Sequence, residues 1–278
     1  MEDFSYQKPK SLKDAVDAFG ASDDGLFLAG GQTVIPVMKL GLAAPADVID
    51  LSGIPDLGAI TVSDTTVSIG AMATHAAVGA SEDIRQAIPA LADLAAGIGD
   101  PQVRARGTLG GSIANNDPAA DYPAAMLALN ATITTDKRDI TADDFFTGMF
   151  ETALEEGEII TRVDIPVVDA AAYAKFANPA SRLALAGVFV AQMNDESGGE
   201  VRVAVTGAGP GVFRAEQMEA VLSNDFSAAA LEGVSVAADD FNSDIHASAE
   251  YRAHLIGVLA KRAVLTMTGA ANGKGGGQ

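Results

Sequence analysis

Two glycine pairs, each followed by small polar residues, are the parts of this sequence best suited to bind a ligand. One lies in Ala29–Thr33 (AGGQT) and the other in Thr108–Ser112 (TLGGS). Glycine lets a ligand approach the backbone closely and leaves amide N–H groups free to face an anion. Either pair alone is typical of a tight strand-to-helix turn with no ligand. Because two such turns occur in one chain, we predict that they bind the two phosphates of a diphosphate.

The second pair opens a longer stretch, residues 106–123, that contains few large apolar side chains. Its glycines disfavour a stable helix, so we expect an exposed backbone surface that leads into a helix over 123–129. Asp117 and Asp121 follow the glycines, and either carboxylate could accept a hydrogen bond from a polyol hydroxyl. A third glycine cluster, over 207–211, lacks the spacing of a dinucleotide fingerprint, and we interpret it as a turn.

The elements around the glycine pairs indicate an α/β organisation. A helix over 11–19 precedes an apolar strand at 26–28, and the first pair then leads into a helix at 34–40. A returning strand at 48–51 completes a small unit. After it, hairpin-like strands and alanine-rich helices alternate, and we place them at 60–70, 71–80, 82–96, 131–135 and 158–165.

Beyond residue 170 the sequence changes to longer β-like runs. We predict three strands, at 173–176, 183–193 and 201–206, with a polar hairpin turn over 194–199. Helices at 214–222, 228–234 and 248–267 follow, and the glycine-rich end of the chain favours disorder. A domain boundary near residue 170 is therefore expected.

Composition excludes several classes of partner. The chain has 278 residues, and its 37 acidic against 18 basic residues give a formal net charge of −19. Such a charge disfavours nucleic acid as a partner, because phosphate binding requires positive side chains. The absence of cysteine excludes disulfides and iron–sulfur clusters on this chain. No apolar stretch approaches the roughly 20 residues that span a bilayer, and the acidic N-terminus lacks a signal-peptide pattern, so we expect a cytoplasmic protein.

The motifs resemble, in order, those of the FAD-binding medium subunit of molybdenum hydroxylases, the family of aerobic carbon monoxide dehydrogenase and xanthine dehydrogenase. The two glycine pairs match the flavin-diphosphate loops of that family. The resemblance runs from Phe4 to about Gly269, and its other matching segments are Asp100–Arg104, Asp117–Asp121, Tyr173–Phe176, Arg214–Glu216 and Tyr251–Leu255. Several motifs in one order are far more specific than either glycine pair alone.

The resemblance implies an α+β fold in two domains. Residues 1–170 would form a two-part α/β FAD-binding domain of the vanillyl-alcohol oxidase-like type, with its subdomains divided near residue 55. Residues 171–269 would form a three-stranded antiparallel sheet with helices, and residues 270–278 a disordered tail. The strands and helices predicted from the residues after 170 agree with this second domain.

The resemblance also implies a cofactor site. The backbone of each glycine loop would bind one phosphate, and Asp121 would contact the polyol side of FAD. Leu183 lies in the segment that approaches the flavin ring in relatives, some of which carry a tyrosine there. His75 and Lys175 could point at the flavin, although a helix-start histidine and an interdomain packing contact are equally open readings. The candidate FAD-binding residues are Ala29, Gly30, Gly31, Gln32, Thr33, His75, Thr108, Gly110, Gly111, Ser112, Asp121, Lys175 and Leu183.

The function implied by the resemblance is electron transfer within a complex. Non-covalent FAD on this chain would receive electrons from [2Fe-2S] clusters on a small subunit, which a molybdopterin centre on a large subunit supplies. The assembly would be a dimer of heterotrimers, and a quinone, NAD or another acceptor would take the electrons. No catalytic or metal-binding residue is expected on this chain. Two alternatives stay open: a self-contained FAD-dependent oxidoreductase of a small organic substrate, and a nucleotide-binding regulatory module.

Overall fold

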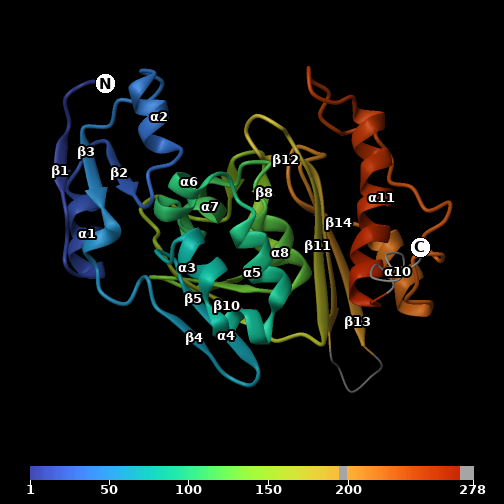
Figure 1. The fold of residues 1–278 in the computed structure, drawn as a ribbon. Coiled ribbons are helices and arrows are strands. Elements are labelled where there is room, and N and C mark those ends of the chain that lie inside the picture. Colours follow the sequence, from blue (N-terminus) through green and yellow to red (C-terminus); the bar gives the residue numbers. More distant parts are fainter. Residues whose placement is uncertain (194–198, 270–278) are drawn as a thin grey trace.

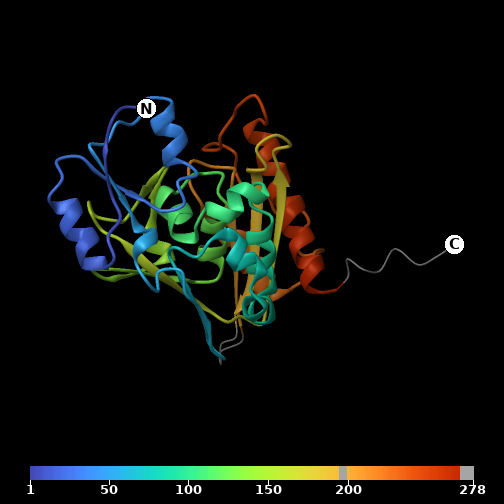
Figure 2. The ribbon, with the colours of Figure 1, turned by 60° about the vertical axis from the view of Figure 1, so that its left-hand side comes forward.

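The computed structural model describes residues 1–193 and 199–269, and its N-terminal part is a small α/β unit (Figures 1 and 2). Three parallel strands pair in the order β1-β3-β2, with two helices between them in the chain and a 3₁₀ turn after the last strand. The elements are β1 (Ser5–Gln7), α1 (Leu12–Gly20), β2 (Gly25–Leu28), α2 (Val34–Lys39), β3 (Asp47–Asp50) and η1 (Leu51–Gly53). The predicted strand, glycine turn and helix are therefore present, and Ser11 caps α1 by accepting from the Asp14 N–H.

The middle of the chain forms an antiparallel five-stranded sheet in the order β4-β5-β10-β6-β7. Its strands are β4 (Ile60–Val62), β5 (Thr66–Gly70), β6 (Thr132–Thr135), β7 (Asp139–Thr141) and β10 (Ile160–Pro166). The helices of this part are α3 (His75–Ala80), α4 (Glu82–Ala87), α5 (Pro89–Ala96), α6 (Pro101–Arg106), α7 (Leu109–Asn115), α8 (Tyr122–Ala128) and α9 (Ala142–Phe145). A short hairpin of β8 (Phe146–Gly148) and β9 (Glu151–Thr152) follows α9. One buried core joins the sheet to the helices, with Ile69, Leu91 and Val163 among its members.

Two helix predictions in this part are wrong. The single helix expected over 82–96 is broken at Ile88, because Pro89 supplies no N–H and restricts the residue before it. The glycine pair at Gly110 and Gly111, expected to disfavour a helix, lies in the first turn of α7. Thr108 caps that helix by accepting from the Gly111 N–H, so a local cap and tertiary packing outweigh the low helix propensity of glycine.

The C-terminal part is a sheet that separates two layers of helices (Figure 1). Its antiparallel strands run in the order β11-β12-β13-β14, and α10 and α11 follow. The elements are β11 (Ala170–Ala177), β12 (Ala184–Met193), β13 (Glu200–Thr206), β14 (Phe213–Arg214), α10 (Glu216–Asn224) and α11 (Ala249–Met267). The sheet has four strands where we expected three, because the chain after the 207–211 turn returns to pair two residues with β13. The helix expected over 228–234 is absent from the described residues, and Gly233 there has a φ of +78° that no α-helix accepts.

Alternation along β12 and β13 explains why this sheet is covered on both faces. Phe189 and Ala204 belong to the core shared with the middle part, whereas Val188 and Val203 pack with α10 and α11. Because strand side chains point to opposite faces in turn, a continuous apolar run is buried on both sides. The sheet therefore holds α8 and the loop before it in a fixed place between the two halves of the molecule.

The turn predicted from residue 194 and the tail predicted over 270–278 fall on residues that the structure does not describe. No helix within 1–193 and 199–269 is long and apolar enough to cross a membrane. The strand β10 ends at Pro166 and β11 begins at Ala170, while the boundaries predicted near residues 55 and 170 stay predictions.

Candidate cofactor-binding site

The structure brings the two glycine loops into contact. A Cβ added to Gly30 would lie 2.2 Å from the carbonyl oxygen of Arg106 and 2.7 Å from the Cα of Gly107. A Cβ on Gly111 would lie 3.4 Å from the Cβ of Ala29. The first loop therefore lies directly against the second, as the prediction of a shared diphosphate site requires. Gly30 thus also allows two backbone segments to touch, a role that the sequence pattern alone did not predict.

The first loop has free hydrogen-bond donors. Gly31 has a φ of +69°, a left-handed conformation that turns successive N–H groups toward one side of the chain. The N–H groups of Gly30 through Thr33 have no hydrogen-bond partner among the described residues. Gln32 and Thr33 are exposed, Gly30 is half-buried and Gly31 is buried. Adjacent unpaired amides beside a glycine turn form a cradle that suits one phosphate.

The second loop offers fewer free amides than we expected. The N–H groups of Gly110, Gly111 and Ser112 donate to Ala71 O, Thr108 Oγ1 and Thr108 O, at 2.8, 3.1 and 3.0 Å. The hydroxyl of Thr108, a residue that is 3% exposed, accepts one of these bonds and donates none among the described residues. A Cβ on Gly110 would lie 2.5 Å from that of Ala71, so this glycine serves helix packing. The second loop can therefore offer a ligand hydroxyl donors, which would add to the amide donors of the first loop.

Asp121 lies at the centre of a buried polar cluster. Its carboxylate is 3% exposed and accepts from the hydroxyl of Tyr173 at 2.5 Å and from Nζ of Lys175 at 3.0 Å. Burial raises the pKa of Asp121, while the charge of Lys175 and the hydrogen bonds oppose that rise. Tyr173 and Lys175 alternate on β11 and share one face of it, and both donate to Asp121. This carboxylate therefore fixes two side chains of the C-terminal sheet beside α8.

His75 lies behind the second loop rather than beside the first. His75 is 5% exposed, and its backbone N–H donates to Gly107 O at 2.9 Å. A Cβ on Gly107 would lie 2.5 Å from the ring nitrogen Nε2 of His75. Burial, with the nearby charge of Arg104, lowers the pKa of His75 to about 4, so the ring is neutral at pH 7. Its Nδ1 and the hydroxyl of Tyr122 have no partner among the described residues, and the two rings lie 5.4 Å apart.

Leu183 and Asp117 occupy the edges of this region. Leu183 follows the turn between β11 and β12 and is 41% exposed, which leaves an apolar side chain on the surface at that edge. Asp117 accepts from the Ala119 N–H at 2.8 Å, a local turn contact that stabilises the loop before α8. Of the two aspartates that the sequence left open, Asp121 is thus the one joined to the other half of the molecule.

Two residues that shape this region were not predicted from the sequence. Gly187 leaves room for the hydroxyl of Tyr173, because a Cβ there would lie 2.4 Å from that oxygen. Arg182 donates to Gly99 O at 3.2 Å, so the β11–β12 turn closes over the loop between α5 and α6. A glycine inside an apolar strand is a recognisable signal of close approach, whereas the arginine has no local signal at all.

Comparison with known families agrees with this arrangement. Residues 2–168 match the family model described as the FAD binding domain in molybdopterin dehydrogenase, and residues 164–267 match the CO dehydrogenase flavoprotein C-terminal domain. This chain belongs to the FAD-binding medium subunits of molybdenum hydroxylases. The two matches cover nearly all of the described chain, and the mixed α/β fold is that of the family.

Individual relatives extend over the same length. The medium subunit of nicotine 6-hydroxylase from Paenarthrobacter nicotinovorans is 37% identical over 94% of this chain and 95% of its own. The carbon monoxide dehydrogenase medium chain of Hydrogenophaga pseudoflava is 33% identical over 94% and 96% of the two chains. A solved structure, reconstituted CO dehydrogenase from Oligotropha carboxidovorans, superposes with a TM-score of 0.85 at 33% identity, covering 96% and 98%. The names of these relatives indicate enzymes with different substrates.

Proposed function

We propose that this chain binds one FAD without a covalent link and passes electrons from a partner chain's iron–sulfur clusters to an external acceptor. The observation that carries the proposal is the contact between the two glycine loops, one of which has a row of unpaired amides. The medium-subunit family to which the chain belongs supports the electron-transfer role. FAD, when bound, supplies the redox chemistry, and the protein supplies binding and orientation.

The proposed roles of the residues follow from their positions. The amides of Gly30, Gly31, Gln32 and Thr33, next to Ala29, would hold one phosphate. The hydroxyls of Thr108 and Ser112 would hold the other, while Gly110 and Gly111 keep α7 close enough. Asp121 would accept a hydroxyl of the polyol chain, with Lys175 kept in place beside it. Leu183 would lie against the ring edge, and His75 would support the loop from behind.

The proposed assembly takes its partners from the family. A large molybdopterin-binding chain and a small [2Fe-2S] chain would join this one in a dimer of heterotrimers in the cytoplasm, with a quinone, NAD or another acceptor. We further propose that the FAD-binding part is of the vanillyl-alcohol oxidase-like type. Relatives named for nicotine and for carbon monoxide have similar medium subunits, which supports a substrate site on the large chain.

Acid precipitation of the flavin-loaded protein tests the non-covalent mode. We expect the supernatant to be yellow and to contain one equivalent of FAD per chain, because the described residues offer a cradle of amides and hydroxyls for the diphosphate. Flavin that stays on the pellet would contradict the non-covalent mode. Protein that contains no flavin when produced with its partner chains would contradict the function itself.

Replacing Asp121 by asparagine should weaken FAD binding without abolishing it. One hydrogen bond from a hydroxyl to a carboxylate contributes about 1.5–3 kcal/mol, which corresponds to roughly ten- to a hundredfold in the dissociation constant. Asp117→Asn is the matched variant, because its carboxylate makes a local turn contact only. FAD titrations of both apo-variants, with melting temperatures as a folding check, should place the larger loss on Asp121. A larger loss on Asp117 would reverse the assignment.

A further inference from the structure

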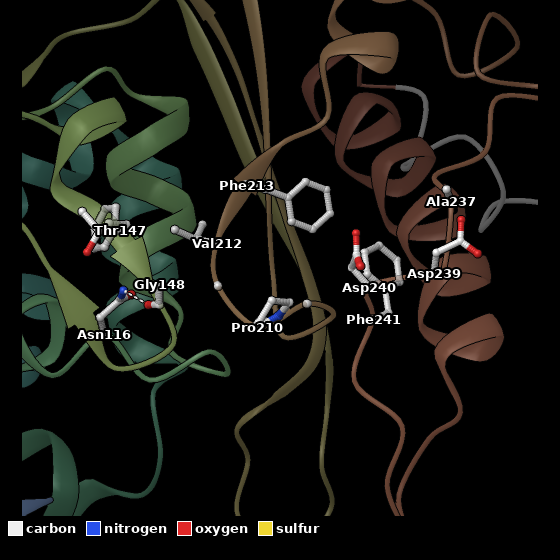
Figure 3. A pocket seen from close by; sticks show the side chains of 13 residues that line it. Asn116, Thr147, Gly148, Pro210, Val212, Phe213, Ala237, Asp239, Asp240 and Phe241 are labelled. Carbon is white, nitrogen blue, oxygen red and sulfur yellow. Dashed lines mark hydrogen bonds between the residues drawn. The ribbon is translucent and has the colours of Figure 1, made fainter.

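A cavity of about 430 Å³ lies apart from the glycine loops, between the β8–β9 hairpin and the C-terminal part (Figure 3). On one side are Asn116 and the strand β8, and on the other are the turn before β14 and the segment before α11. Its walls are made by residues 146–148, 209–213 and 239–241, with Asn116 and Ala237. A volume of this size is typical of sites for small organic molecules.

Side-chain amides hold both walls of this cavity in place. Asn116, which ends α7 with a φ of +41°, donates through Nδ2 to Gly148 O at 2.9 Å and to Glu151 O at 2.7 Å. Asn242 donates through Nδ2 to Gly209 O at 2.7 Å. Each side-chain amide thus donates to a backbone carbonyl of the cavity wall. These hydrogen bonds hold the concave shape without a ligand.

The chemistry of the lining favours a cation with an apolar body. The rings of Phe213 and Phe241 lie 5.7 Å apart, and Phe146 lines the cavity from the hairpin. In the view of Figure 3 the Asp240 carboxylate overlaps the edge of the Phe241 ring, whereas that of Asp239 points toward Ala237, and both aspartates are exposed. Neither carboxylate has an ion-pair partner within residues 1–193 and 199–269. No lysine or arginine occurs among the described residues of the lining, so a phosphate or carboxylate ligand would meet negative charge without compensation.

We propose that this cavity binds a small organic cation, an ammonium group attached to an aromatic or aliphatic body. The ammonium group lies against the Asp240 carboxylate and over the face of Phe213 or Phe241, which attract it through charge and through the negative ring face. The apolar body fills the space toward Phe146 and Val212. This site is distinct from the diphosphate cradle, whose donors suit an anion.

Calorimetric titration of the FAD-loaded chain with benzyltrimethylammonium tests the proposal. We expect binding of the cation and none of phenylacetate, with the dissociation constant rising about tenfold in Asp240→Asn. Phe241→Leu should weaken binding by about fivefold, because it keeps an apolar side chain but removes a ring face. Asp23→Asn, a matched change of an exposed aspartate in the N-terminal unit, should leave the affinity unchanged.

Several results would overturn the site. The cation could fail to bind, or Asp240→Asn and Asp23→Asn could bind it equally well. Phenylacetate could bind as tightly as the cation, which would leave no role for the carboxylate. A titration of the assembled complex adds a further arm. If the cation binds the isolated chain but not the complex, a side chain of a partner fills the cavity, and the small-molecule proposal is wrong. FAD content serves as the folding control in every arm.

Discussion

Replacing Gly30 by alanine is expected to abolish FAD binding at micromolar concentrations of the cofactor. The new Cβ would lie 2.2 Å from a backbone oxygen of Arg106, and a backbone atom cannot rotate away as a side chain can. The two loops must then separate, and the amides of the first loop no longer face the donors of the second. Losing two charge-assisted hydrogen bonds at about 1.5–3 kcal/mol each corresponds to roughly 10²–10⁴ in affinity.

Two further glycine variants make the experiment with Gly30→Ala decisive. Gly20→Ala should bind FAD normally, because nothing lies within 4 Å of an added Cβ there. Gly111→Ala should bind less tightly by about tenfold, since the nearest atom to its Cβ would belong to a side chain, the hydroxyl of Thr108 at 2.8 Å. Flavin fluorescence titrations give the affinities, and melting curves report folding. Full FAD occupancy in Gly30→Ala would show that contact between the two loops is not needed for binding.

The comparison of these glycines shows what the sequence could and could not predict. Patterns that depend on neighbours along the chain were predictable, such as the helix that begins after Ser11 and the strand, glycine turn and helix over 26–40. The helix α7 was not, because glycine propensity is a weak local term that the packing of Gly110 on Ala71 overrides. The prediction thus attributed to ligand approach alone two glycine pairs that also serve the packing of one segment on another.

Contacts between distant segments were beyond prediction for a different reason. The cavity beside Asn116 is lined from separate stretches that share no motif, and only the fold brings them together. His75 appeared in the sequence as a polar residue after a hairpin, yet its neutral ring is buried behind Gly107. Whether a histidine faces a ligand or the core depends on the angle of one helix start, which periodicity does not specify.

The described residues also bear on whether this chain could oxidise a substrate by itself. A self-contained flavin enzyme needs an acid or a base free to move a proton near the flavin. The carboxylate of Asp121 is bound by Tyr173 and Lys175, and burial lowers the pKa of His75 to about 4, behind the loop. These contacts leave neither group free to move a proton beside the flavin, and the chain has no cysteine to carry a cluster. This agrees with the electron-transfer role of the medium-subunit family to which the chain belongs.

We expect the isolated, FAD-loaded chain to show no reduction of its flavin by the substrate of the complex. No group of three or more histidine, cysteine, aspartate or glutamate side chains within 1–193 and 199–269 could hold a metal ion that activates a substrate. The complex itself should show rapid bleaching at 450 nm with its substrate, whether carbon monoxide, an aldehyde or an N-heterocycle. Stopped-flow absorbance on the isolated chain and on the reconstituted complex measures both.

The half-reaction with the acceptor is the control for this experiment. Flavin on the isolated chain, once reduced by dithionite, should still reduce an artificial acceptor such as dichlorophenolindophenol, because that step needs only bound FAD. Failure of this control in folded protein would mean that a partner also completes the acceptor side. If substrate bleaches the isolated chain as fast as the complex, electron delivery by a partner is wrong. The chain would then be a self-contained oxidoreductase, and a group other than Asp121 and His75 would have to transfer the proton.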